Sequence, residues 1–131
     1  MKKFLACVIT LVLMLTMAIP AFAASVGFSF TVNRGGASVA TAQVKKDDTA
    51  AAWISGLSSP NISSSNQCSF RVRKAVDDSS CSALYNQSNT NSFNIYYLSG
   101  TAIRNEYYKL WASAPSGNSL SNVQISGTFA P

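Results

Sequence analysis

The residues with the clearest chemical potential lie in one short segment, RNEYYKLWASA at positions 104–114. If this segment is a strand, its side chains alternate between two faces, so Tyr107, Lys109 and Trp111 share one face. The two rings would then be about 13 Å apart on an outward face, with the lysine between them. Aromatic rings at this spacing can stack on sugar rings, and the lysine can meet an anionic group. We predict a ligand-binding surface at these three residues, with packing under a covering loop as the alternative.

Catalytic chemistry has few candidates in this chain. It contains no histidine and only five carboxylates, so a Ser-His-Asp triad is excluded, and no serine lies in a G-x-S-x-G motif. The pairs Asp47–Asp48 and Asp77–Asp78 cannot flank a scissile bond, because adjacent side chains on an extended chain point to opposite sides. We predict that both pairs cap turns. The expected protein is not an enzyme and has no catalytic residue, cofactor or metal.

The N-terminal segment has the three parts of a secretory signal peptide. Lys2 and Lys3 precede an apolar run over residues 4–19, and Pro20 is followed by small residues at Ala21 and Ala23. We predict that residues 1–23 are removed and that the mature protein is secreted, with no transmembrane segment.

Two cysteines, Cys68 and Cys81, remain in the predicted mature chain. In an exported protein such a pair predicts a disulfide, worth about 3 kcal/mol for a closed loop of this length. A metal site is the competing interpretation, but two thiols without histidine make a poor ligand set. The disulfide would fasten the long polar connection after the strand to the start of that strand.

Alternating apolar and polar side chains predict most of the strands. The pattern is clearest at residues 25–32, 68–75 and 121–129, and further strands are expected at 92–100 and 105–114. In the segment 105–114, the apolar face would be formed by Tyr108, Leu110 and Ala112. In the segment 68–75, Ser69, Arg71 and Arg73 would face solvent.

Two connections in the chain are less regular. Residues 37–57 are rich in alanine, which leaves strand and helix both open for this section. The segment PSGNSL at 115–120 contains turn-forming residues and indicates a hairpin between 105–114 and 121–129. The fold expected for residues 24–131 is a single all-β domain, a small antiparallel β-sandwich of immunoglobulin-like or jelly-roll-like kind.

The mature chain is mildly basic, because only Lys2 and Lys3 are removed with the leader. The cations are scattered: Arg34, Lys45, Lys46, Arg71, Arg73, Lys74, Arg104 and Lys109. This balance suits an anionic surface or cell-wall polymer, although general solubility explains it as well. It is too sparse for nucleic-acid binding, and we expect a monomer.

Three short elements give the chain a resemblance to uncharacterised small secreted proteins of Gram-positive bacteria. They are K-x-D-x-T at 45–49, N-E-Y-Y at 105–108 and the terminal S-G-T-F-x-P at 126–131. The resemblance implies an exported, β-rich domain. The leader, the absence of catalytic groups and the outward aromatic side chains predict a secreted, non-enzymatic binding domain that recognises cell-wall polysaccharide, another carbohydrate or an anionic surface. The alternative is an antimicrobial, bacteriocin-like factor that acts on competitor membranes.

Overall fold

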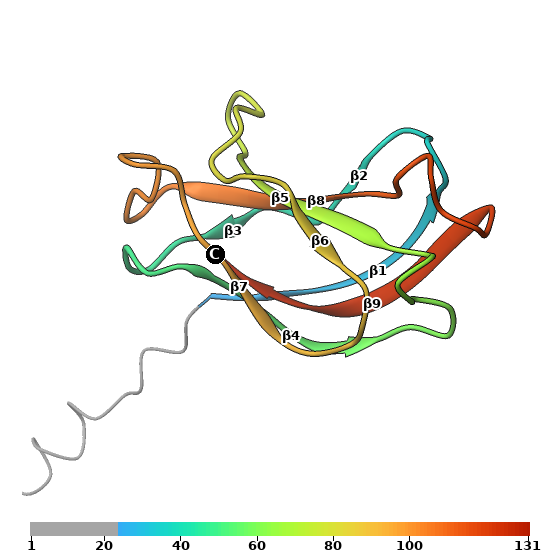
Figure 1. Cartoon of the computed structure of the whole chain (residues 1–131). Coiled ribbons are helices and arrows are strands. Elements are labelled where there is room, and N and C mark those ends of the chain that lie inside the picture. Colours follow the sequence, from blue (N-terminus) through green and yellow to red (C-terminus); the bar gives the residue numbers. More distant parts are fainter. Residues whose placement is uncertain (1–23) are drawn as a thin grey trace, which may run out of the picture.

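The computed structural model describes residues 24–131, which form two antiparallel β-sheets packed face to face (Figure 1). The predicted leader at 1–23 lies outside the described residues. The first sheet has the strand order β1-β9-β4-β7, formed by Val26–Asn33, Asn122–Ala130, Ala52–Ser58 and Phe93–Ile95. The second has the order β2-β8-β5-β6, formed by Val39–Ala40, Tyr107–Ser113, Cys68–Lys74 and Tyr85–Gln87, and β3 (Val44–Lys45) also pairs with β8.

The β-sandwich prediction is confirmed at this level. Residues 37–57, which the sequence left open between strand and helix, contribute β2, β3 and β4. No helix in the described part of the chain is long and apolar enough to cross a membrane.

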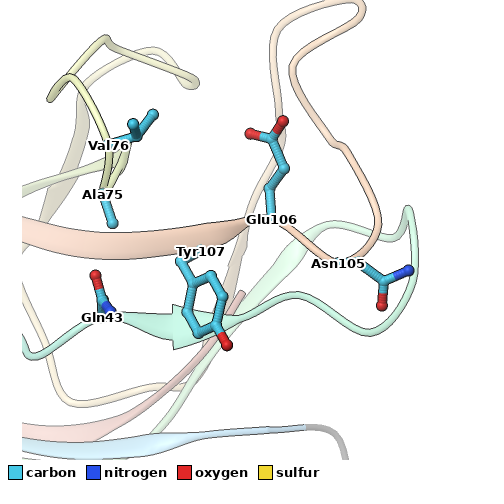
Figure 2. A pocket seen from close by; sticks show the side chains of 6 residues that line it. All are labelled: Gln43, Ala75, Val76, Asn105, Glu106 and Tyr107. Carbon is cyan, nitrogen blue, oxygen red and sulfur yellow. The ribbon is translucent and has the colours of Figure 1, made fainter.

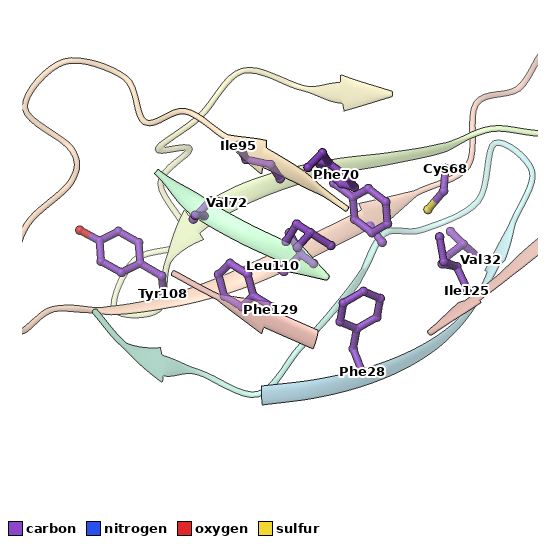
Figure 3. Packing of buried hydrophobic residues seen from close by; sticks show 14 of the residues in the cluster. Phe28, Val32, Cys68, Phe70, Val72, Ile95, Tyr108, Leu110, Ile125 and Phe129 are labelled. Atoms are coloured by element: carbon purple, nitrogen blue, oxygen red, sulfur yellow. The ribbon is translucent and has the colours of Figure 1, made fainter. Parts of the chain in front are cut away.

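The core lies between the two sheets and is made by the inward side of each alternating strand. In β8 every second residue is buried, including Tyr108, Leu110 and Ala112, which confirms the predicted phase of this strand. Figure 3 shows how rings and branched side chains from both sheets meet in the core. Burying a side chain such as Phe70 or Phe129 stabilises the fold by about 1.5–3 kcal/mol.

The predicted hairpin between residues 105–114 and 121–129 is wrong. β8 belongs to the second sheet and β9 to the first, so the intervening segment crosses from one sheet to the other. The connection is fastened by Asn118, whose amide group both accepts from the backbone N–H of Gln67 (2.9 Å) and donates to its carbonyl (2.7 Å). A turn-rich connection has the same composition whether its strands pair side by side or face each other across a core.

The predicted disulfide is not present in the structure, where Cys68 and Cys81 are both buried free cysteines. Cys68 begins β5, whereas the amide of Cys81 donates to the carbonyl of Val72, four residues further along that strand. Four residues of strand rise amount to about 13 Å, beyond the Cα separation of about 4.4–6.8 Å that a disulfide requires. The polar connection is instead held to the end of β5 by hydrogen bonds, among them one from the Val72 amide to the Ser82 hydroxyl (2.9 Å).

A β-bulge in β4 explains why position 127 on the neighbouring strand β9 is a glycine. The register of β4 against β9 shifts between Ser55 and Ser58, and Gly56 within this stretch has a φ of 60°. The bulge brings the Ser55 carbonyl and the Leu57 side chain close to Gly127 of β9, where a Cβ would lie 3.0 and 2.8 Å from them. A side chain at position 127 would therefore force Leu57 and the β4 backbone to shift.

Candidate functional site

The outward side of the second sheet collects the predicted ligand-binding residues. Tyr107, Lys109 and Trp111 point away from the core on β8, because their neighbours in the strand point into it. The pairing of β5 with β8 sets Arg71 opposite Trp111 and Arg73 opposite Lys109. These five residues, together with Lys45 opposite Tyr107 on β3, form what we call the basic face.

The two aromatic rings of the basic face differ in how open they are. Tyr107 is 48% exposed, whereas Trp111 is only partly exposed. The guanidinium carbon of Arg73 lies 4.7 Å from the centroid of the Trp111 ring, a cation–π contact. What covers the tryptophan is therefore a neighbouring side chain on the adjacent strand. The structure brings the three predicted residues to one face but leaves only the tyrosine ring freely available for stacking.

A hollow of about 470 Å³ adjoins Tyr107 at the start of β8. Figure 2 shows its lining, which comes from three separate segments and includes Gln43, Val76, Asn105 and Glu106. Val76 is 85% exposed. The hollow thus combines an aromatic ring, an exposed aliphatic side chain and amide groups, a combination that suits a sugar better than a purely apolar ligand.

Carboxylates neutralise only part of the basic face. Lys109 lies 4.0 Å from Asp78, and Lys74 at the end of β5 pairs with Glu106 at 3.1 Å. The hydrogen bond to Glu106 raises the pKa of Lys74 above its usual value. Neither Arg71 nor Arg73 forms an ion pair with any carboxylate of residues 24–131, so their positive charge is available to an external anion.

The adjacent aspartates have the turn-capping contacts that the sequence predicts. Asp48 accepts a hydrogen bond from the amide of Ala50 (2.9 Å), and Asp77 accepts one from the amide of Ser79 (3.0 Å). The Ser79 contact lowers the pKa of Asp77. Within the described residues, no group of His, Cys, Asp and Glu is arranged to hold a metal ion.

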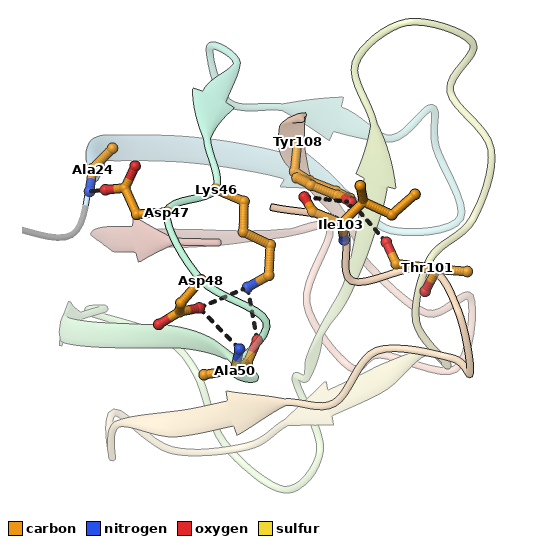
Figure 4. A network of polar contacts seen from close by, with 8 residues as sticks. All are labelled: Ala24, Lys46, Asp47, Asp48, Ala50, Thr101, Ile103 and Tyr108. Carbon is orange, nitrogen blue, oxygen red and sulfur yellow. Dashed lines mark hydrogen bonds and ion pairs between the residues drawn. The ribbon is translucent and has the colours of Figure 1, made fainter. Parts of the chain in front are cut away.

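Lys46 is a fully buried lysine whose burial no sequence pattern indicates. Its ammonium group donates to the Ala50 carbonyl (2.7 Å) and to Asp48 (3.3 Å), and it lies 4.5 Å from the centroid of the Tyr97 ring. Figure 4 shows it beside the contacts of Asp47. These partners replace the lost hydration of the ammonium, and the residue thereby fixes the turn before β4.

The same region joins two of the short elements that the sequence singled out. The amide of Lys46 donates to the Glu106 carbonyl (2.8 Å), and the amide of Asn105 donates to the Lys46 carbonyl (2.8 Å). Residues 45–49 and 105–108 therefore lie side by side. They form the end of the second sheet that carries Tyr107.

Sequence reasoning missed two features of the surface. The alternation in residues 68–75 indicated that Arg71 and Arg73 face outward, but only the register of β5 with β8 places them beside Trp111. Ser69, predicted to face solvent with them, is buried and donates to the side chain of Asn86 on β6. The second feature is a pair of rings on the outer side of the first sheet: Trp53 is 44% and Tyr96 is 75% exposed. Trp53 lies opposite Asn94, so Tyr96 is its diagonal neighbour on the same side.

Comparison with protein-family models, with curated proteins and with solved structures found no match to this chain.

Proposed function

We propose that this protein is a secreted, non-enzymatic binding domain that attaches to an anionic cell-wall polysaccharide through the basic face. The observation that carries the proposal is the placement of Arg71 and Arg73, without carboxylate partners among the described residues, next to Trp111 and in line with the open ring of Tyr107. The cations attract the charged groups of the polymer and Tyr107 stacks on its sugar rings.

This arrangement favours an extended, charged polymer over a compact ligand. The outward residues of β8 run from Tyr107 to Trp111, a length of about 13 Å that is longer than a single sugar ring. Part of the binding energy comes from cations at a solvent-exposed surface, so the affinity should fall as salt screens the charges.

The test is calorimetric titration of the mature chain with an anionic cell-wall polysaccharide and with a neutral polysaccharide of similar length. Tyr107→Ala should weaken binding by about 1 kcal/mol, or five- to tenfold. Tyr96→Ala is the matched control, because it removes an even more exposed tyrosine, which directly follows β7 of the other sheet, and should leave the affinity unchanged. Equal binding of both polymers, or a loss caused by Tyr96→Ala alone, would refute the proposal.

One observation favours a second function, action on the membranes of competing bacteria. Val76 (85% exposed) and Leu84 (50%) are aliphatic side chains beside hollows that adjoin the basic face, and apolar groups flanked by cations are typical of proteins that bind the membrane interface. Dye leakage from anionic vesicles separates the two functions. The polysaccharide-binding function predicts that the vesicles remain intact.

A further inference from the structure

A second, smaller cavity lies on the basic face beside Trp111. It has a volume of about 180 Å³ and is lined by Arg71, Arg73, Trp111, Leu84, Ser38 and Ser113 among others. Since one water molecule takes up about 30 Å³ of liquid, the cavity has room for a small polyatomic ion with some of its hydration. It is separate from the hollow beside Tyr107, with which it shares no lining residue.

Three nitrogen atoms of the residues around this cavity have no hydrogen-bond partner within residues 24–131. They are Nε of Arg71, Nε of Arg73 and the indole Nε1 of Trp111, and all three are buried. A buried donor without an acceptor costs about 1–3 kcal/mol, so a ligand whose oxygens reach these nitrogens after a small side-chain adjustment would gain from each of them. All three groups donate hydrogen bonds and none accepts them, so the ligand that fits is rich in oxygen acceptors.

The surrounding charges determine what kind of acceptor fits. The cavity is lined by two guanidinium groups that have no ion pair within the described residues. The stacking of Arg73 on Trp111 holds one guanidinium in place before any ligand arrives. Arg71 has one further contact, a long hydrogen bond of 3.5 Å to the Ser80 hydroxyl. Paired arginine forks suit an oxyanion with several acceptor oxygens.

We infer that Arg71, Arg73 and Trp111 form a binding site for the oxyanion of a phosphate ester. The inference rests on the proposed function, because it specifies the anionic group of the polymer that the basic face binds. A phosphodiester offers two non-bridging oxygens, which can accept from the guanidinium groups of β5 and from the indole of β8 at the same time.

The test uses inorganic phosphate as the probe and the Trp111 indole N–H as the reporter. The chain has two tryptophans, and the variant Trp53→Phe assigns the remaining indole signal in an NMR spectrum. Phosphate at constant ionic strength should shift this signal in a saturable manner. Arg71→Lys and Arg73→Lys, which keep the charge but lose the fork, should each weaken binding about tenfold. The control Arg104→Gln removes an exposed cation that does not line the cavity and should have no effect.

Each outcome separates this site from the proposed function. If phosphate does not shift the indole signal while the polysaccharide still binds, the phosphate site is overturned and the binding function stands. If phosphate binds and the polysaccharide does not, the proposed function is overturned and the oxyanion site stands. Equal saturation by acetate would overturn the assignment to phosphate, and unchanged affinity in both lysine variants would overturn the assignment to the arginines.

Discussion

Tyr107 and Tyr108 are adjacent residues with opposite environments, and this contrast gives a direct test of the phase of β8. Tyr108 is fully buried, whereas Tyr107 is 48% exposed. The hydroxyl of Tyr108 donates to the Thr101 carbonyl (2.7 Å) and accepts from the Ile103 amide (3.0 Å) (Figure 4). Burial raises the pKa of Tyr108, so the hydroxyl stays protonated at neutral pH.

Tyr108→Phe keeps the ring and removes both hydrogen bonds. Each bond contributes about 0.5–1.5 kcal/mol net, so the free energy of unfolding should fall by about 2 kcal/mol. For a domain of about 100 residues this corresponds to a decrease in melting temperature of about 10 °C. Tyr107→Phe removes a hydroxyl from a half-exposed ring and should change stability by less than about 0.5 kcal/mol.

Urea unfolding of both variants, followed by tryptophan fluorescence, measures the difference. The denaturant dependence should be the same for both, because neither variant changes the surface exposed on unfolding. A loss of stability in Tyr107→Phe that equals or exceeds the loss in Tyr108→Phe would refute the assigned phase of β8. The outward placement of Lys109 and Trp111 would then fail with it.

Three further predictions concern stability. Burial raises the pKa of Cys68 from 9.0 to about 12. Because the unfolded chain loses this thiol proton at lower pH than the folded chain, the free energy of unfolding should fall by up to about 1.4 kcal/mol per pH unit as the pH rises above 9.0. In Cys68→Ala the urea midpoint should therefore fall less steeply with pH. Gly127→Ala brings a Cβ to 3.0 Å from a backbone oxygen and should cost about 1–3 kcal/mol in chemical unfolding, whereas Gly27→Ala meets nothing closer than 3.9 Å and should be tolerated. The Ala24 nitrogen donates to Asp47 at 2.9 Å. In a chain that begins at Ala24 this nitrogen is an ammonium, so Asp47→Asn should lower the stability measured by thermal unfolding by about 0.2–1 kcal/mol. The loss should be smaller in a chain with an extra residue before Ala24.

Each of these three predictions would be contradicted by a different result. An alkaline profile of Cys68→Ala as steep as that of the unmodified chain would show that this thiol does not govern the profile. Equal stability of the two glycine variants would contradict the close approach of β4 to Gly127. The same cost of Asp47→Asn with and without an extra N-terminal residue would show that the charge of the terminus is not used.

The inward and outward faces of the strands could be predicted from the sequence because side-chain alternation is a local property. It placed Tyr108 and Leu110 in the core and Tyr107 outside, as the structure shows. The partners of each strand could not be predicted in this way. Whether residues 121–129 pair with β8 or face it across the core depends on contacts between distant segments.

The same limit explains what was missed at the candidate site. Arg71 and Arg73 were predicted to face solvent, but their position beside Trp111 follows from the register of β5 and β8. The disulfide prediction rested on the presence of two cysteines in an exported chain, which carries no information on their separation; in the structure Cys81 lies beside Val72 rather than beside Cys68. Burial of Lys46 required partners from its own turn and from Tyr97, which no periodic pattern indicates.

The central claim is that the basic face is the binding surface. The most direct test is to add an anionic cell-wall polysaccharide to residues 24–131 and to map which amide signals shift in the NMR spectrum. The predicted result is a set of shifted signals along β8 and β5 that includes the Trp111 indole. Shifts confined to β4 and β7, with the Trp53 indole as the responding tryptophan, would contradict the claim and move the binding surface to the first sheet.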